Sequence, residues 1–355
     1  MSSLANANQG TTPVREGYGF DIVSLDRWMH ENIPDYAGPI AVEQFRGGQS
    51  NPTYKLTTPG GNYVLRRKPG GPILKGAHAI EREAKVMSVL GLHGIPVPHV
   101  RGLCIDRSVI GTNFYVMDMV VGRIFWDASM SELNVTERPA HFDAMNATIA
   151  ALHSIDPQTV GLGDYGRPGN YFARQIARWS KQYLEDEVAG RDPNMDRLIE
   201  WLPDHIPAEE ETSIVHGDFR CDNMIFHPTE PRVLAVLDWE LSTLGDPGAD
   251  FAYHAMMYRM PPHIVAGLAG SDISALGIPS EAAYLEAYCR CRDMDGMPDY
   301  DFYVAFNFFR LAAIFHGIKG RFLRGNASSA QARERIAVLP ELAALAWAQA
   351  KRAVA

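Results

Sequence analysis

The part of the sequence best suited to chemistry is a short polar stretch between two apolar segments. It reads HGDFRCDN over residues 216–223 and directly follows Ile214 and Val215. Asp238 comes fifteen residues after Asn223, at the end of the apolar run VLAVL. The order is therefore an Asp, an Asn five residues later, and an Asp after a second apolar strand. These are the side-chain types that transfer of a phosphoryl group requires.

Each of these residues fits a defined part of that reaction. Phosphoryl transfer needs a carboxylate that orients the attacking hydroxyl, and oxygen ligands that hold magnesium between the phosphates. Asp218 fits the first role. Asn223 and Asp238 fit the second, because they are hard oxygen donors at the ends of neighbouring strands. Arg220 is placed to neutralise charge on the transferred phosphoryl group.

The chain before this stretch alternates between strand-like runs and turns. AVEQF, TYKLTT and YVLRRK, all between residues 41 and 68, predict three short antiparallel strands joined by glycine-rich turns. Residues 78–94 carry apolar side chains at three- and four-residue steps, which predicts a helix. Two more strands are expected around 100–105 and 113–121.

From about residue 137 the pattern is typical of helices. It is interrupted over 213–238 by two short strands that flank the polar loop. We expect a first domain over 1–120, a sheet with one helix preceded by a disordered tail over 1–18, and a helical domain over 121–355. The helices are predicted at 137–154, 170–188, 194–202, 247–259, 278–292, 301–324 and 329–353.

The polar motifs resemble the protein-kinase-like fold, in its aminoglycoside phosphotransferase and choline kinase branch. The matching segments are HGDFRCDN over 216–223 and LDWE over 237–240. Gly217 and Trp239 stand where protein kinases have the Arg of HRD and the Phe of DFG, which favours the small-molecule branch. The resemblance implies an α+β, two-lobed fold with a small antiparallel-sheet N-lobe and a larger, mostly helical C-lobe. It also implies ATP and Mg²⁺ as cofactors.

Three neighbouring residues are expected to support this machinery. His216 is predicted to brace the catalytic loop from its buried side. Asp246 precedes Pro247 and is a candidate N-cap. In related kinases an acid near Asp250 steadies the catalytic loop, so both acids are predicted to be structural.

The first turn of the sheet is a candidate phosphate site. Its residues are Gly47, Gly48, Gln49, Ser50 and Asn51. Glycines let the backbone approach phosphates, and exposed N–H groups can bind them. The turn is neither a Walker A loop nor a full GxGxxG motif, so an ordinary hairpin turn is the alternative.

The third strand and the following helix are expected to supply an ion pair. The family carries a Lys on this strand that contacts the α- and β-phosphates, and the register of VLR places Arg66 there. Lys68 is the alternative, because alternation puts both on one face. Glu83 resembles the paired helix acid of the family, with Glu81 as the alternative.

Residues 113–122 resemble the hinge between the lobes. By position, the adenine edge of the nucleotide would be bound by the Asp118 carbonyl and the Val120 N–H. Because these are backbone groups, the side chains matter mainly for shape and the composition of the segment does not test this expectation.

The acceptor is inferred only from a closer resemblance. Segments such as FRGGQSNPTY, YVLRRKP and AVLDWELSTLGDP resemble kinase domains allied to acyl-CoA dehydrogenases, which implies a 4-hydroxyacyl-CoA thioester as substrate. A basic stretch late in the chain would suit an anionic CoA, or its cations could cap the end of a helix. It consists of Arg310, His316, Lys319, Arg321 and Arg324. An aminoglycoside phosphotransferase is the first alternative.

Two other function classes fit the sequence less well. A catalytically inactive nucleotide-binding module is favoured only by the departure from Lys at Arg66. A hydrolase is disfavoured, because GQSN at 48–51 fails the GxSxG pattern at its last position.

Composition limits the partners. The net charge of −9 disfavours nucleic acid and anionic lipid. No apolar run approaches the roughly 20 residues that span a bilayer, and the N-terminus lacks an apolar core typical of a signal peptide. Four cysteines without a metal-binding pattern suit a reducing cytoplasm. A cytoplasmic enzyme acting on a small hydroxyl compound is therefore expected, of unspecified oligomeric state.

Overall fold

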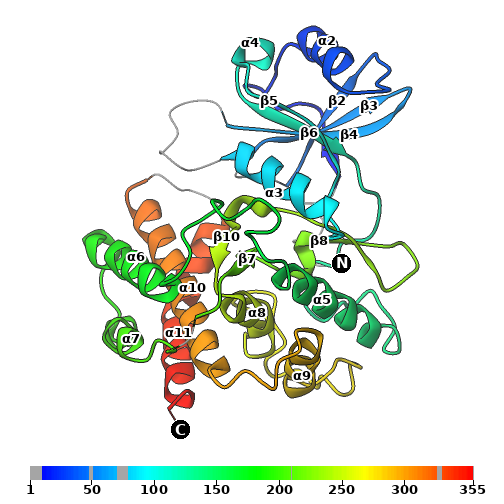
Figure 1. Cartoon of the computed structure of the whole chain (residues 1–355). Helices are drawn as coiled ribbons and strands as arrows, with labels where there is room; N and C mark the ends of the chain where they lie inside the picture. Colours follow the sequence, from blue (N-terminus) through cyan, green and yellow to red (C-terminus); the bar gives the residue numbers. More distant parts are fainter. Residues whose placement is uncertain (1–9, 48–50, 70–78, 209, 326–329, 355) are drawn as a thin grey trace. The chain divides into compact units, whose positions relative to one another are not determined.

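The computed structural model describes residues 10–47, 51–69, 79–208, 210–325 and 330–354, and the chain folds into two compact units (Figure 1). The sheet unit contains the chain up to Trp126 together with Cys221–Ser242. The helical unit contains Asp127–Arg220 and the chain from Thr243 onward. The grouping is not continuous in sequence, because 221–242 returns to the sheet unit. The boundary near residue 120 stays a prediction.

The sheet unit is built on one antiparallel sheet with the strand order β1-β2-β3-β4-β6-β5. Alternating apolar residues place one face of each strand in the core, which is why these short segments pair. All five strands predicted between 41 and 121 are present. The strands are β1 (Thr11–Thr12), β2 (Ala41–Phe45), β3 (Thr53–Thr58), β4 (Gly61–Arg67), β5 (Val100–Cys104) and β6 (Phe114–Asp118).

A helix that the sequence analysis did not predict closes the core of this sheet. It is α2 (Ile22–Asn32), capped by the Asp21 side chain, and it buries Leu25 and Met29 together with residues of β3, β4 and β6. The short helix α4 (Arg107–Ile110) lies beside it. The core residues shared by these elements include Tyr54, Leu56, Leu65, Phe114 and Val116.

The prediction of a disordered tail over residues 1–18 is wrong for residues 10–18. Thr11 and Thr12 pair with Phe45 and Gln44 of β2. The Tyr18 carbonyl accepts hydrogen bonds from the Tyr54 hydroxyl at 2.8 Å and from the Arg67 guanidinium at 3.0 Å. These backbone contacts tie the segment to the sheet, and the polar composition of the N-terminus gave no sign of them.

The sheet unit also holds the predicted helix α3 (Ile80–Leu92) and the hairpin of β8 (Met224–Phe226) and β9 (Val233–Val236). The hairpin joins this unit through a bridge between Arg123 and Phe226 and a hydrogen bond from Val236 N to the Pro96 carbonyl. A Cβ at Gly122 would lie 2.2 Å from the Phe226 carbonyl oxygen, so this crossing requires glycine.

The helical unit contains the seven helices predicted from residue 137 onward, with ends shifted by a few residues. Helix α10 is apolar on nearly all sides and contacts α6, α8 and α11, so it forms the centre of the unit (Figure 1). A two-stranded sheet of β7 (Ser213–Val215) and β10 (Thr243–Gly245) lies in the same unit. The helices are α5 (Arg138–His153), α6 (Tyr171–Glu185), α7 (Pro193–Asp204), α8 (Pro247–Ala255), α9 (Glu281–Cys291), α10 (Tyr300–Leu323) and α11 (Ala330–Arg352).

None of the helices within the described residues combines the length and the apolar character needed to cross a bilayer.

Candidate active site

In the helical unit, the backbone that leads into Asp218 is held by one buried carboxylate. The N–H groups of His216 and Gly217 donate to the two oxygens of Asp250 at 2.7 and 2.8 Å. Asp250 lies in the first turn of α8, and the side chain of Asp246 caps that helix by accepting from Ala249 N. Both acids therefore have the structural roles predicted for them, and Asp250 fixes the path of the catalytic loop.

A second layer of hydrogen bonds keeps Asp250 ionised. Burial would raise the pKa of the Asp250 carboxyl, but hydrogen bonds from His153 and from the His216 N–H hold it below its usual value. Burial lowers the pKa of His153, so its imidazole is neutral. The Tyr288 hydroxyl lies 2.7 Å from His153 Nδ1, and His153 Nε2 lies 3.1 Å from Asp250. The tautomer consistent with both contacts carries its proton on Nε2.

Asp218 follows this braced backbone and keeps a half-buried side chain. Its N–H donates to Nδ1 of the fully buried His216 at 3.2 Å, which is the bracing role predicted for that histidine. One oxygen of its carboxylate accepts a hydrogen bond from the Tyr253 hydroxyl at 2.6 Å. The loop thus presents a carboxylate of fixed orientation.

The loop is also held from the far side. His254 Nδ1 lies 3.1 Å from the Phe219 carbonyl, and burial lowers the pKa of His254 to about 4, so the neutral ring donates to that carbonyl. Arg310 of α10 donates to the Gly217 carbonyl at 2.9 Å. Residues 216–219 each have a backbone partner in this unit, which makes the loop rigid. Arg220 comes next and is half-buried.

In the sheet unit, Asn223 and Asp238 flank the same end of the β8–β9 hairpin. Met224 pairs with Val236, and the Leu237 N–H donates to the Asn223 carbonyl at 2.8 Å. Asn223 therefore lies just before one strand, and Asp238 lies just after the other. An amide oxygen and a carboxylate are donor types that suit a hard cation such as Mg²⁺, and here both residues belong to the same end of one hairpin.

The backbone of Asp238 has an uncommon conformation. Its φ of 66° and ψ of 58° lie in the left-handed region, which residues other than glycine rarely adopt. Such conformations cost free energy and concentrate at functional sites. The conformation therefore marks Asp238 as a candidate functional residue on grounds independent of its side-chain type.

Arg66 of β4 connects the sheet to that carboxylate. Its Nε lies 2.8 Å from Glu83 Oε2, and its Nη2 lies 2.8 Å from Asp238 Oδ1 and 3.5 Å from Glu240 Oε2. The predicted pairing of Arg66 with Glu83 is therefore present. The alternatives form a separate pair, since Lys68 Nζ lies 2.7 Å from Glu81.

Glu83 is the buried centre of this cluster. Burial raises the pKa of its carboxyl, against the opposing attraction of Arg66. The Asn51 side chain donates to Oε1 at 2.9 Å, and the Tyr115 hydroxyl donates to Oε2 at 3.2 Å. Burial would lower the pKa of Arg66, but the surrounding negative charge raises it above its usual value. For both members of the pair, burial and the charge of the partner therefore act in opposite directions.

The structure describes only some of the other residues predicted to contact the nucleotide. Gly47 follows β2, whereas Gly48, Gln49 and Ser50 lie outside the described residues. Asn51 is fully buried, and its side chain braces Glu83. Asp118 ends β6 with its carboxylate on Arg101, and Val120 comes two residues later. Their backbone contacts with adenine stay a prediction.

Two contacts with the catalytic loop, from Tyr253 and Arg310, were not expected from the sequence. Tyr253 lies three residues after Asp250 on α8, hence on the same helix face, and this spacing could have identified it. Arg310 is 93 residues from its partner Gly217, and no local pattern indicates that contact.

The basic residues expected to hold an anionic substrate are mostly used within the fold. Arg310 is buried, and His316 is buried with its Nε2 2.7 Å from the Gly190 carbonyl. Arg324 forms two hydrogen bonds with Asp186, at 2.6 and 2.9 Å. The expectation of one substrate-binding basic stretch is therefore wrong for Arg310 and His316, because α10 runs through the core.

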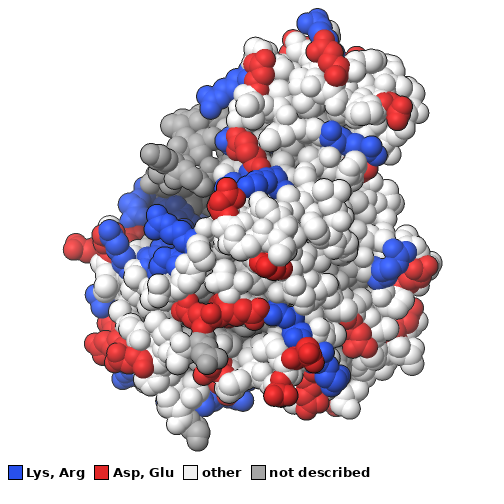
Figure 2. Space-filling view, viewed as in Figure 1, with Lys and Arg blue, Asp and Glu red and all other residues white. Residues whose placement is uncertain are grey.

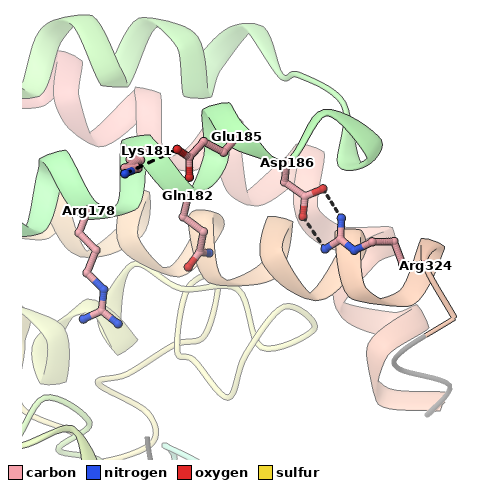
Figure 3. A pocket seen from close by; sticks show the side chains of 6 residues that line it. All are labelled: Arg178, Lys181, Gln182, Glu185, Asp186 and Arg324. Carbon is pink, nitrogen blue, oxygen red and sulfur yellow. Dashed lines mark hydrogen bonds and ion pairs between the residues drawn. The ribbon is translucent and has the colours of Figure 1, made fainter. Parts of the chain in front are cut away.

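A different group of cations lines a hollow beside α6. Figure 2 shows Lys and Arg side chains gathered near this helix, and Figure 3 shows the hollow, which has a volume of about 330 Å³. Lys181 pairs with Glu185 at 3.6 Å. Within the described residues, Arg178 has no carboxylate partner and stacks on Trp179. The lining residues are Arg178, Lys181, Gln182, Glu185, Asp186 and Arg324.

Comparison with known proteins agrees with this geometry. The model of the family described as "Phosphotransferase enzyme family" (APH) matches residues 41–303. Acyl-CoA dehydrogenase family member 10 of Mus musculus is 44% identical over 340 residues, which cover 95% of this chain and 32% of that protein. The chain therefore spans about a third of the length of this relative.

Solved structures show the same fold. A crystallised protein of Ralstonia eutropha JMP134, described as a candidate aminoglycoside phosphotransferase, is 51% identical, with a TM-score of 0.87 over 94% of this chain and 99% of that one. A thermostable mutant of APH(4)-Ia, in a ternary complex with ADP and hygromycin B, is 14% identical, with a TM-score of 0.56 over 93% and 98%. The predicted protein-kinase-like α+β fold is confirmed.

Proposed function

Because the chain belongs to the phosphotransferase enzyme family, we propose that it transfers the γ-phosphate of ATP to a hydroxyl group of a small molecule. Asp218 is the carboxylate that orients this hydroxyl. The observation that carries the proposal is the bracing of residues 216–219, each held by its backbone, around a carboxylate that stays half-buried. Such rigid positioning is the main contribution that a protein makes to phosphoryl transfer.

The residues proposed to bind ATP and Mg²⁺ come mainly from the sheet unit. Asn223 and Asp238 would hold Mg²⁺, which neutralises charge on the phosphates when bound. Arg66 is the cation proposed to contact the phosphates, and Arg220 is proposed to stabilise charge on the transferred group. The turn over 47–51 and the backbone of 118–120 are proposed to hold the phosphates and the adenine. The ADP bound by APH(4)-Ia, which has the same fold, is consistent with a nucleotide substrate.

The first test is the variant Asp218→Ala. Loss of an orienting carboxylate should reduce turnover by about 10²–10⁴-fold, while ATP binding is retained. Glu286→Gln removes the charge of an exposed acid on α9 in the same unit; it is the control and should keep turnover. Near-normal turnover by Asp218→Ala would show that the role is misassigned.

For the acceptor, we propose a 4-hydroxyacyl-CoA thioester. The mouse relative is named as an acyl-CoA dehydrogenase family member, and the hollow beside α6 offers cations to an anionic group. Arg310 contacts the catalytic loop, and Arg324 lies fourteen residues further along the chain at the end of α10. At 1.5 Å per residue the hollow is about 20 Å from the loop. Only an extended substrate, such as an acyl-CoA, could reach both places.

The acceptor is tested by turnover with a 4-hydroxyacyl-CoA, the free hydroxy acid, a choline-like alcohol and kanamycin. For the thioester, Arg178→Ala and Lys181→Ala should raise KM about 10-fold each while kcat stays unchanged, and KM for the free acid should not move. Arg197→Ala on α7 is a control cation outside the hollow. Turnover of kanamycin alone would instead support an aminoglycoside phosphotransferase, the description given to the Ralstonia protein.

A further inference from the structure

The hydroxyl of Tyr253 is placed to act on the catalytic carboxylate itself. Tyr253 is a buried residue of α8, and its Oη lies 2.6 Å from Asp218 Oδ1. Asp250, one turn earlier on the same helix, binds the backbone N–H groups of His216 and Gly217. Helix α8 therefore fixes the loop in two ways, with one residue for its backbone and another for its functional side chain.

Arg310 supports this tyrosine from α10. The guanidinium carbon lies 5.3 Å from the centre of the Tyr253 ring, and Nη2 donates to the Gly217 carbonyl. Within the described part of the chain, Arg310 makes no ion pair with a carboxylate, although it is buried. A cation over an aromatic ring draws electron density from it, which makes the hydroxyl a stronger donor. The contact thus strengthens the hydrogen bond to Asp218.

We propose that Tyr253, backed by Arg310, is a positioning residue of the transfer reaction. By holding one oxygen of Asp218, it gives the carboxylate a single orientation toward the acceptor hydroxyl. This inference rests on the proposed role of Asp218. Tyr253 keeps its proton throughout: burial and the neighbouring Asp218 both raise the pKa of its hydroxyl, so it donates a hydrogen bond and takes no part in proton transfer.

Tyr258 provides a control that separates the hydrogen bond of Tyr253 from the packing of its ring. Tyr258 follows five residues later, is also buried, and its hydroxyl has no hydrogen-bond partner among the described residues. Tyr258→Phe therefore removes a buried hydroxyl without removing a hydrogen bond. A difference between Tyr253→Phe and Tyr258→Phe isolates the contact with Asp218, because both variants keep the ring.

The experiment measures steady-state kinetics of Tyr253→Phe with the acceptor that gives wild-type turnover. We expect kcat to fall about 10- to 100-fold, since small misplacements of a reacting group have effects of this size, with KM for ATP and acceptor unchanged. A loosely held carboxylate should also favour the acceptor hydroxyl over water less strongly, so more ATP is hydrolysed. The amount of ADP released per phosphorylated product should therefore rise. Tyr258→Phe should match the wild type in all of these values.

A double-mutant cycle distinguishes the possible failures. In an Asp218→Ala background, Tyr253→Phe should cause no further loss of turnover, because it acts through Asp218. Wild-type kcat in Tyr253→Phe, or fully additive losses, would overturn the inference. An active Asp218→Ala variant would instead refute the proposed function. The same four proteins, unfolded by urea, give the coupling between the two side chains without any acceptor, and zero coupling also overturns the inference.

Discussion

The buried pair of Arg66 and Glu83 gives the sharpest prediction about stability. Arg66→Met keeps most of the side-chain volume but leaves Glu83, whose side chain is 2% exposed, without its cation. Removing one partner of a buried ion pair costs about 3–5 kcal/mol. The hydrogen bonds from Asn51 and Tyr115 remain, so we expect about 3 kcal/mol.

The cost should depend on pH with a definite sign. Burial already raises the pKa of Glu83, and loss of Arg66 raises it further. A carboxyl with a raised pKa in the folded state costs no stability below its unfolded pKa, because it is protonated there. Its penalty appears as pH rises through the folded value. The free energy of unfolding of Arg66→Met should therefore be closer to that of the wild type at pH 5 than at pH 8.

Urea unfolding at the two pH values tests this reasoning. The double variant Arg66→Met with Glu83→Leu should recover most of the loss, because no buried charge is left unpaired. Asp238 and Glu240 also lose Arg66 but are 36% and 25% exposed, so water replaces it at little cost. Lys68→Met, at the more exposed pair, is the control and should cost less than about 1 kcal/mol. A loss below about 1 kcal/mol for Arg66→Met at pH 8, or a double variant less stable than the single, would refute the reasoning.

Three further predictions concern acids around the site. Asp238→Ala should abolish the magnesium dependence of ATP binding, measured by calorimetry with and without Mg²⁺; undiminished dependence would exclude Asp238 as a ligand. Asp250→Asn replaces an acceptor of two backbone N–H groups with an amide, and turnover should fall about 100-fold while ATP affinity, measured by calorimetry, holds. Burial raises the pKa of Asp246 from 3.8 to about 6, so its ionised form costs stability as pH rises through that value. Asp246→Asn keeps the helix cap and should stabilise the protein by up to about 3 kcal/mol at pH 8 but hardly at pH 4, as urea midpoints at the two pH values would show.

Short-range patterns predicted much of the fold and the centre of the site. The strands at 41–67 and the helix at 80–92 follow from alternation and from three- and four-residue steps. Asn223 and Asp238 lie beside short apolar runs in the sequence, and this predicted their places at the ends of strands β8 and β9. These features depend on residues close in sequence, so periodicity and spacing contain the necessary information.

Features that depend on distant residues were missed or predicted wrongly. Helix α2 is stabilised by a core formed with strands up to Phe114, and the polar residues before it obscured it. Arg310 and His316 were taken as substrate-binding cations, yet α10 is surrounded by other helices, which bury both side chains in contacts with backbone carbonyls. A charged residue in an amphipathic helix points to solvent, whereas in a central helix it must find a partner inside.

Arg66 helps to decide between an active kinase and a catalytically inactive binding module. The resemblance predicts a lysine there, and its replacement was the only sign of an inactive binding module. An ammonium group is a compact point charge, whereas the planar guanidinium donates in two directions at once. Arg66 uses this geometry to contact Glu83 and Asp238, each at 2.8 Å. The substitution therefore keeps the positive charge and adds a link from β4 to the proposed magnesium ligand, which argues for an adapted site and against a decayed one.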